Sequence, residues 1–412
     1  MNARLLPALI LALPGLAFAA KSCDVKAYGA TGDGVTKDTA AIQKAIDDCA
    51  AAGGGTVVLA GAPMYVSGPL VLKSHITLSI ATGTTLAGSE EHDDYPLIEE
   101  LRESGRQPLL SSDKATDITI NGGGTIDGRG QSWWPDRSAA NKRPRLIVFR
   151  HSSHILMENI TVQNSPSWQI VPYYSTDLVF RNMTVYAPDR VSHNTDGIDP
   201  FSSSHVLIEH VTIDTGDDNI AIKSGQPNSP GGDEPSHDIV IRDSTFLHGH
   251  GLSIGSEVAG GVYNVLAERI HFKGTGTGVR IKSNRDRGNE LKHFVYRDLK
   301  MEDVNTPILI SEFYPKIPDV IDSQPVGRLT PRFSDITIEN LTATGARQAA
   351  IIVGLPESPV TGLKLTNVRI KADKGAVIKY AHMDTKGFIV NARQGHAYMT
   401  GPDMVDASGE TQ

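Results

Sequence analysis

The chain has 412 residues, of which 39% are hydrophobic and 21% are charged, and its formal net charge is −8. This length is enough for a large buried core, so either a soluble globular protein or a solenoid fits the composition. The negative charge argues against a general polyanion-binding protein such as a nucleic-acid-binding protein, and any anionic partner needs a local basic patch.

The first residues have the three parts of a secretory signal peptide. Arg4 supplies a short positive region, residues 5–16 form an apolar core, and residues 17–19 (AFA) form a small-x-small cleavage signal. The apolar core is too short for a membrane anchor, which needs about 20 residues, and no later segment is apolar enough to cross a membrane. We expect a signal peptide at 1–19, one mature domain at 20–412, and secretion to the extracellular space.

Helical periodicity occurs at one place near the start of the mature chain, at about residues 38–52. Ile42, Ala45, Ile46 and Cys49 recur at the spacing of one helix face, and a glycine follows the segment as a stop signal. We therefore expect one amphipathic helix there, with its apolar face packed on the structure below it.

The chain contains two cysteines, Cys23 and Cys49, and both lie soon after the predicted signal peptide. An even count in an exported protein favours one disulfide that staples the start of the mature chain, and two free thiols are the alternative. The spacing of the two residues excludes a C-x-x-C metal or redox site.

Most of the remaining chain is a repeat of short strands in which hydrophobic and polar residues alternate. Alternation with period two predicts that one face of each strand is buried. A single copy cannot bury that face alone, so successive copies must stack. The copies read ATDITI, SSHILMENITV, STDLVFRNMTV, SSHVLIEHVTI, SHDIVIRDSTF, VYNVLAERIHF, LKHFVYRDLKM, FSDITIENLTA and VTGLKLTNVRI.

Stacked copies of this kind predict an all-β fold, a right-handed parallel β-helix, in which the helix at about 38–52 caps the N-terminal end. An uncovered end would expose apolar interior and an unpaired strand edge, which invites aggregation. A β-propeller and a β-sandwich are the alternatives. The copies lack the four-strand modules of a propeller blade, and the hairpin dipeptides of a sandwich are scarce.

Four short polar motifs follow one another at about one coil of spacing along the repeat. They are NTDG at 194–197, GDD at 216–218, GHG at 249–251 and RIK at 280–282. A residue one coil further along the chain lies one rung away, about 4.8 Å in a parallel sheet. Each motif lies near the second strand of its repeat, so we expect the four to form one column on one outer face.

The residue types in this predicted column favour catalysis over a structural role. Any one of these polar residues alone is more often structural, but their convergence on one column makes that interpretation weak. The neighbours Asp217 and Asp218 cannot both follow strand alternation, and the glycine before them permits a bend through which both reach one cleft. The candidate catalytic residues are Asp196, Asp217, Asp218 and His250, beside Arg280 and Lys282.

Converging carboxylates suggest glycosidic cleavage, in which one acid protonates the leaving oxygen and another stays ionised to activate water. Like charges nearby raise the pKa of one carboxyl, while neighbouring cations hold the others ionised. The cations of Arg280 and Lys282 suit an anionic sugar such as a uronic acid. Arg285, Arg287 and Lys292 extend this basic stretch.

The four motifs, in this order and spacing, resemble glycoside hydrolase family 28, the polygalacturonases. The resemblance covers nearly the whole mature chain, starting from DVKAYGATGDGVTKDTAAIQKAID. NTDGIDP, TGDDNIAIKSG, GHGLSIGSE and GVRIKS look most like secreted bacterial endopolygalacturonases. The resemblance implies inverting hydrolysis of α-1,4-linked galacturonan, the de-esterified pectin of plant cell walls, with no cofactor and no metal.

The resemblance also implies a role for each catalytic candidate. Asp217 is similar to the family's general acid, and Asp196 with Asp218 to the residues that position and deprotonate the attacking water. His250 is similar to the active-site histidine that tunes the protonation of the acid.

The same resemblance implies a set of substrate-binding residues. Arg280 and Lys282 resemble the residues that bind the galacturonate carboxylate, and Asn194 is expected to contact the sugar or the acids. Tyr314, in ISEFYP, resembles the family's substrate-binding tyrosine.

Other functions share some of these features. Exo attack differs from endo attack by loops that close one end of the cleft, for which 226–236 and 316–332 are the candidates. A Ca²⁺-dependent pectate lyase shares fold and substrate, with Asp196, Asp217 and Asp218 as metal ligands. A non-catalytic β-helix that binds polysaccharide needs no acid pair. We expect a monomer with a pectin-type polysaccharide as partner, and neither nucleic acid nor membrane.

Overall fold

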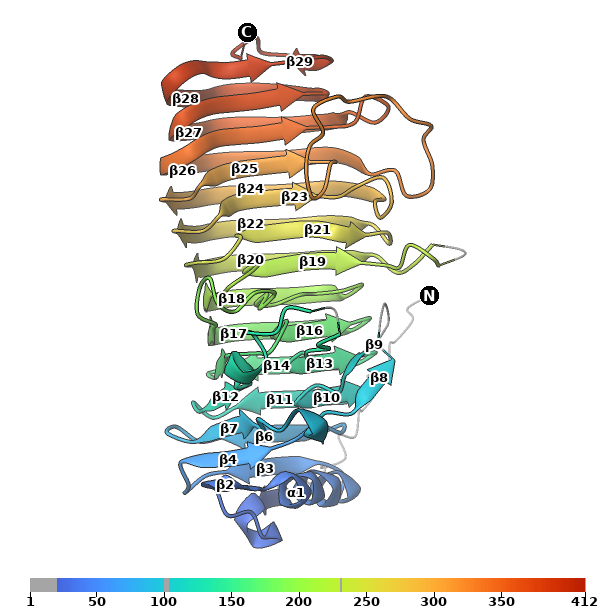
Figure 1. Cartoon of the computed structure of the whole chain (residues 1–412), viewed down its shortest axis with the longest axis vertical. Helices are drawn as coiled ribbons and strands as arrows, with labels where there is room; N and C mark the ends of the chain where they lie inside the picture. The colour runs from blue at the N-terminus through green and yellow to red at the C-terminus, as the bar shows by residue number, and fades with distance from the viewer. Residues whose placement is uncertain (1–20, 100–103, 139, 230–231, 412) are drawn as a thin grey trace, which may run out of the picture.

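The computed structural model describes residues 21–99, 104–138, 140–229 and 232–411, and its strands stack into one tall coil (Figure 1). The predicted signal peptide at 1–19 lies outside the described residues. Strands of successive coils pair in parallel, which confirms the predicted all-β, right-handed parallel β-helix. No helix among the described residues has the length and apolar character that crossing a membrane requires.

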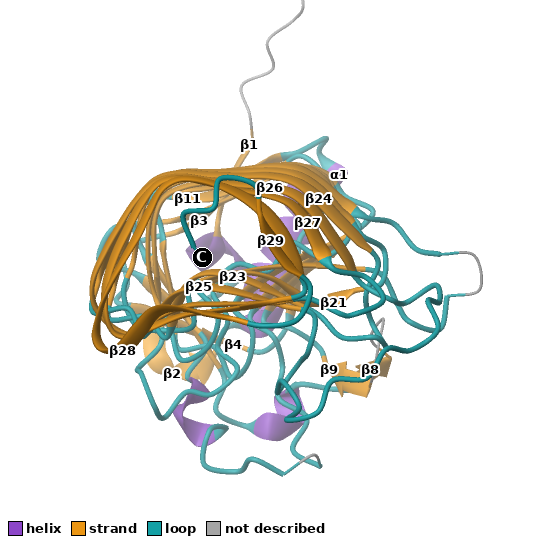
Figure 2. Ribbon diagram, turned by 90° about the horizontal axis from the view of Figure 1, so that it is seen from above, coloured by secondary structure: helices purple, strands orange, loops and turns teal. Residues whose placement is uncertain are grey.

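Viewed end-on, the coil has one broad curved sheet and one flatter sheet that faces it (Figure 2). The strands of the curved sheet are β1 (Lys21–Asp24), β3 (Gly55–Leu59), β6 (Ile76–Ile80), β11 (Thr116–Asn121), β14 (Ser153–Glu158), β17 (Thr176–Tyr186), β18 (Ser204–Asp214), β20 (Ser236–Phe246), β22 (Val262–Lys273), β24 (Glu290–Glu302), β26 (Arg332–Val353), β27 (Val360–Lys379), β28 (Ala381–Thr400) and β29 (Met404–Asp406).

The flatter sheet consists of β5 (Leu70–Val71), β10 (Leu110–Asp113), β13 (Ile147–Arg150), β16 (Ile170–Tyr173), β19 (Ile220–Ser224), β21 (Leu252–Val258), β23 (Thr277–Lys282) and β25 (Thr306–Ser311). The remaining strands of the coil are β2 (Asp33–Lys37), β4 (Met64–Ser67), β7 (Thr85–Gly88), β12 (Thr125–Asp127) and β15 (Thr161–Gln163). A separate antiparallel hairpin is formed by β8 (Leu97–Glu99) and β9 (Ser104–Arg106). The 3-10 helices are η1 (Val25–Tyr28), η2 (His92–Asp94) and η3 (Gly130–Ser132).

The predicted repeat corresponds to an unbroken column of apolar side chains inside the curved sheet. Each member pairs with the equivalent residue of the next coil, and none is more than 2% exposed. A side chain buried in this way is stabilised by about 1.5–3 kcal/mol relative to exposure. The members are Ile118, Ile155, Leu178, Val206, Ile239, Val265, Phe294, Ile336 and Leu363.

A polar residue precedes eight of the nine members of this column and a glycine precedes Leu363, and the backbone at each of these positions is left-handed. Asn, Asp and His tolerate that conformation better than other non-glycine residues, so the chain can turn there at low cost. The polar residue that comes before an alternating strand in the sequence therefore marks a corner of the coil, and these corners stack on one another. They are Asp117, His154, Asp177, His205, Asp238, Asn264, His293 and Asp335, with φ between 49° and 60°.

The predicted capping helix is present as α1 (Thr39–Ala51). Its buried residues are Ile42, Ala45, Ile46 and Cys49, the four that the periodicity indicates. They join the same core cluster as the strands of the first coils, so the helix closes the N-terminal end of the coil.

The predicted disulfide joins Cys23 of β1 to Cys49 of α1, with Cα atoms 6.3 Å apart. Its sequence separation is 26 residues. Closing such a loop lowers the conformational entropy of the unfolded chain, which stabilises the folded protein by about 3 kcal/mol. We expect Cys23→Ala/Cys49→Ala to lose about this much unfolding free energy, measured by urea titration. The wild type treated with a thiol reductant is the control. An unchanged urea midpoint would show that the disulfide does not contribute to the unfolding free energy.

Candidate active site

The four polar motifs lie on adjacent rungs of the flatter sheet. Residues 198–201 bridge β16 on one side and β19 on the other, and β19, β21 and β23 follow as parallel neighbours. Ile198, Ile220 and Leu252 pair with one another across successive rungs. Asp196, Asp218 and His250 each lie two residues before one of them, so these three side chains occupy equivalent places in three successive rungs. The RIK motif follows on the next rung, in β23.

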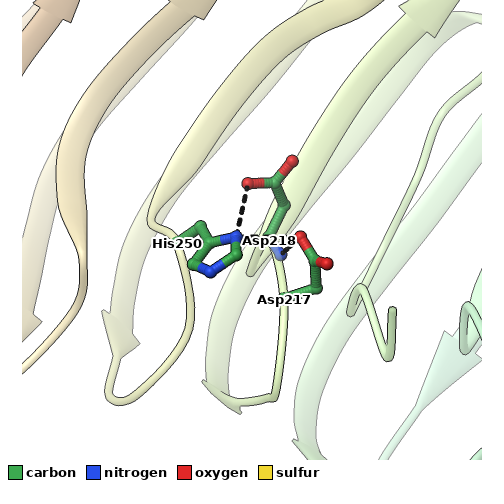
Figure 3. Close-up of side chains that lie close together, drawn as sticks. All are labelled: Asp217, Asp218 and His250. Carbon is green, nitrogen blue, oxygen red and sulfur yellow. Dashed lines mark hydrogen bonds and ion pairs between the residues drawn. The ribbon is translucent and has the colours of Figure 1, made fainter. Parts of the chain in front are cut away.

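Asp217, Asp218 and His250 point toward one another (Figure 3). His250 Nδ1 lies 2.9 Å from Asp217 Oδ1 and 3.8 Å from Asp218 Oδ1. The backbone N–H of Asp218 also donates to Asp217 Oδ1, at 2.9 Å. Both neighbours reach the site because the chain passes close to Ser192 at Gly216, where a Cβ would lie 2.1 Å from the Ser192 carbonyl oxygen. Only glycine fits that approach.

Asp218 lies at the floor of the site, and cations surround its carboxylate. Its Oδ1 accepts from Arg280 Nη1 at 2.8 Å and from Ser253 Oγ at 2.8 Å, and its Oδ2 accepts from Lys282 Nζ at 2.7 Å. Burial opposes the charge, but Lys282 and then Arg280 outweigh it and hold the pKa of Asp218 far below its usual range. Lys282 Nζ also lies 5.3 Å from the ring centre of Tyr314.

Asp217 is more open, and both of its oxygens have partners. Besides the contacts of Oδ1, Oδ2 accepts from Asn194 Nδ2 at 3.3 Å. Burial raises the pKa of Asp217, but the hydrogen bond to His250 and the positive charges of His250 and Lys282 outweigh it, so the pKa is lowered. Asp217 is therefore ionised in the free protein at neutral pH.

Asp196 is in the opposite state. It is 4% exposed, and its Oδ1 has no hydrogen-bond partner among the described residues. Burial, and then the charge of Asp217, raise its pKa well above the usual value. Asp199 is fully buried as well, and burial raises its pKa in the same way. Burial and the neighbouring charges thus move the pKa values apart: those of Asp196 and Asp199 are raised, and those of Asp217 and Asp218 are lowered.

Comparison with known proteins agrees with this site. The family model for glycosyl hydrolases family 28 matches residues 47–387. The chain belongs to this family. It is therefore a glycoside hydrolase, as the sequence predicts.

Named relatives within family 28 are similar over most of the chain. A probable polygalacturonase of Vitis vinifera is 32% identical, over 91% of this chain and 80% of its own length. An endo-polygalacturonase of Pectobacterium carotovorum subsp. carotovorum is 30% identical, over 83% of this chain and 86% of its own. The solved structure of a Thermotoga maritima exopolygalacturonase superposes with a TM-score of 0.80 and 26% identity, covering 90% of this chain and 92% of that one.

The site of this family 28 chain contains residues that the sequence reasoning did not single out. Lys223 is 4% exposed, and its Nζ lies 3.2 Å from Glu257 Oε2. Burial opposes its charge, but Glu257 and the buried aspartates raise its pKa, so it stays a cation beneath the acids. Lys223 and Asp199 lie inside the quoted strings GDDNIAIKSG and NTDGIDP, and strand alternation could have indicated both. Arg143, whose Nη2 donates to Asn194 Oδ1 at 2.8 Å, had no such signal.

The predicted basic extension is not a free positive surface. Arg285 pairs with Glu357 at 2.6 Å, and Arg287 pairs with Asp286 at 2.9 Å. Lys292 likewise pairs with a neighbouring glutamate, at 2.8 Å. Each charge has a carboxylate beside it, which sequence spacing does not reveal, so within this basic stretch Arg280 and Lys282 are the cations that contact Asp218.

The geometry disfavours the calcium-dependent lyase alternative. Asp217, Asp218 and His250 offer ligand atoms within 4.8 Å of one another, which is close enough for a metal ion. However, both Asp218 oxygens are already bound by the cations Arg280 and Lys282, which repel a divalent ion. Ca²⁺ also requires six to eight oxygen ligands rather than an imidazole.

Proposed function

We propose that this chain is an endopolygalacturonase, which hydrolyses α-1,4-galacturonosidic bonds of de-esterified pectin with inversion. The observation that carries the proposal is the juxtaposition of three carboxyls with Arg280 and Lys282 on adjacent rungs of one sheet face. The acids suit glycosidic cleavage, and the cations suit a uronic acid. Relatives named as polygalacturonases over most of the chain support the same substrate.

The proposed role of Asp218 follows its ionisation state. Asp218 is held ionised and deprotonates the attacking water, which Asp196 helps to position. Asp217 is the general acid, and His250 tunes its protonation through the 2.9 Å contact.

Substrate binding is assigned to the residues beside Asp218 and Asp217. Arg280 and Lys282 hold the galacturonate carboxylate, and Tyr314 forms the wall over Lys282. Asn194, which donates to Asp217, completes the sugar-binding side.

Asp217 must gain a proton before it can act as an acid, because its pKa is lowered in the free protein. Bound galacturonan supplies the change, since it excludes water and adds negative charge, and both raise a carboxyl pKa. The basic limb of kcat is therefore expected at higher pH than the basic limb of kcat/KM, because kcat reports the complex and kcat/KM the free enzyme. Steady-state rates on polygalacturonate across pH test this. Coincident basic limbs would contradict it.

Time-resolved sizing of products from polygalacturonate tests the endo mode. Oligomers of intermediate length early in the reaction support endo attack, whereas monomer or dimer alone indicates exo attack. Exo attack is the second candidate because of the likeness to the Thermotoga exopolygalacturonase. The loops at 226–236 and 316–332 both follow the carboxyl ends of strands of the flatter sheet, and Arg328 donates to the carbonyl of Pro227 between them. An unsaturated, ultraviolet-absorbing product would instead indicate a lyase.

The setting of the enzyme is part of the proposal. We infer a secreted, monomeric protein in which 20–412 form one catalytic domain after removal of 1–19. The N-terminal signal features and the disulfide support export, because disulfides persist in oxidising compartments. The continuous core from the capping helix to the last coils supports a single domain.

A further inference from the structure

A side chain from outside the four motifs contacts Asn194, which in turn contacts Asp217. Arg143 lies in the connection between β12 and β13 and is half-buried beside Asn194. Its Nη1 donates to the carbonyls of Pro166 at 2.9 Å and His193 at 2.8 Å, and its Nη2 donates to Asn194 Oδ1 at 2.8 Å. One planar guanidinium therefore fixes both the backbone before Asn194 and the amide of Asn194.

The contact with Arg143 decides which way round the Asn194 amide lies. A guanidinium can only donate hydrogen bonds, so the amide oxygen must face Arg143 and the NH₂ group must face away from it. That NH₂ group donates to Asp217 Oδ2 at 3.3 Å. The other Asp217 oxygen is bound by His250 and by the N–H of Asp218. Arg143 thus completes the set of contacts that orient the Asp217 carboxyl.

The connection that carries Arg143 is anchored to the body of the coil. Trp133 is fully buried and stacks on the ring of His92, with centroids 3.4 Å apart. Trp134 Nε1 donates to the carbonyl of Ser165 at 3.0 Å. Asn141 Nδ2 donates to the carbonyl of Trp133 at 3.1 Å, which ties the segment that carries the guanidinium to these anchored residues.

We propose that Arg143 is a positioning residue for hydrolysis, which holds the amide of Asn194 so that its NH₂ group faces Asp217. The inference rests on the proposed function, because it concerns the carboxyl assigned there as the acid. Without Arg143 the Asn194 amide can turn and present its oxygen to Asp217, where a protonated carboxyl is the favoured partner.

Loss of Arg143 raises the pKa of Asp217 in two ways. A turned amide favours the protonated carboxyl, and a positive charge near the site is removed. Because the acid must be protonated to work, the basic limb of kcat/KM then moves to higher pH. The charged groups that face Asp217 from the neighbouring rungs remain in place; they are Asp196, Asp218, His250 and Lys282.

The experiment compares Arg143→Ala with a matched control on the same connection. Arg143→Ala is expected to lower kcat on polygalacturonate about tenfold, as for a misoriented reacting group, and to shift the basic limb of kcat/KM upward with KM nearly unchanged. Arg143→Lys keeps the charge and is expected to restore most of the pH profile. The control Arg137→Ala removes an exposed arginine of this connection and should leave kcat and the pH profile unchanged.

A double-mutant cycle separates positioning through Asn194 from a general structural role. If Arg143 acts through the amide, Arg143→Ala has no further effect on kcat in an Asn194→Ala background. Equal effects of Arg143→Ala in both backgrounds would overturn the proposal. So would a rise in KM at unchanged kcat, which would mean that Arg143 binds the polysaccharide directly.

Failure of this inference is distinguishable from failure of the proposed function. The wild type is assayed for reducing-sugar release from polygalacturonate in the same series. An inactive wild type would refute both the proposed function and the role of Arg143 in it. An active wild type with independent effects of the two substitutions would refute the role of Arg143 alone.

Discussion

Replacement of Asp217 by asparagine is expected to lower kcat on polygalacturonate by about 10²- to 10⁴-fold with a modest change in KM. Asparagine has nearly the shape of aspartic acid and can keep the contact of its oxygen to His250, although its NH₂ group cannot accept from Asn194 as Oδ2 does. It has no acidic proton to give to the leaving oxygen. The loss therefore falls on the chemical step, and reducing-sugar release at saturating substrate measures it.

Asp214→Asn is the matched control for this substitution. Asp214 also faces a histidine, with His248 Nδ1 2.9 Å from its Oδ1, but it is outside the group that contains Asp217. The control should retain the turnover of the wild type. Thermal unfolding of both variants checks that the fold persists, and turnover near the wild-type value in Asp217→Asn would remove Asp217 from the role of acid.

A second test separates the two candidate acids, because the pKa of Asp196 is raised and that of Asp217 is lowered in the free protein. A galacturonide with a good leaving group needs little proton donation. Asp217→Asn should therefore recover much of its activity on such a substrate, whereas Asp196→Asn should not. The reverse result would exchange the roles of the two aspartates.

The fold could be predicted from the sequence because its energetics repeat along the chain. Every coil buries the same face, so the alternation that contains Ile118 or Val265 recurs with each copy, and stacking is the arrangement that covers it. The helix cap was equally visible, since Ile42 and Cys49 lie at helical spacing. The turns of the stack also carry a local signal, because a residue that tolerates the left-handed conformation stands at each corner, and it is polar at all of them except the glycine before Leu363.

The site was predictable only as far as stacking converts spacing into proximity. Asp218 and His250 meet because they hold equivalent places in adjacent rungs. Arg143 was not predictable, because it arrives from a connection whose path depends on the burial of Trp133 rather than on a repeat. The partner of Arg285 could not be predicted either, since Glu357 lies 72 residues along the chain. The order of residues in the sequence thus predicts which groups lie close together on the rungs of the coil. It does not predict the contacts that the loops bring about.

The cations of the site are expected to hold the base, Asp218, ionised as well as to bind the substrate. Lys282→Met removes the Nζ that lies 2.7 Å from Asp218 Oδ2 and leaves Arg280 as the remaining cation on that carboxylate. Breaking one partner of a buried ion pair is costly because the other charge stays buried. We expect kcat/KM on polygalacturonate to fall by about 100-fold.

The pH dependence of kcat shows whether Lys282→Met has lost the effect of Lys282 on Asp218 or its effect on substrate binding. Lys282 lowers the pKa of Asp218, so its removal raises that pKa. A base works only when ionised, so its activity is lost as pH falls through its pKa, and the acid limb of kcat must therefore move to higher pH. Lys292→Met, which removes a half-buried cation paired with Glu290, should leave that limb in place.

The contact between Lys282 and the substrate is tested by comparing the rates on two polymers. Wild-type enzyme should hydrolyse de-esterified polygalacturonate faster than methyl-esterified pectin, because esterification removes the charge that Arg280 and Lys282 bind. Lys282→Met should narrow that preference while shifting the acid limb, since one ammonium group faces both the sugar carboxylate and Asp218. An unmoved acid limb would deny its link to Asp218, and equal wild-type rates on the two polymers would deny its link to the substrate.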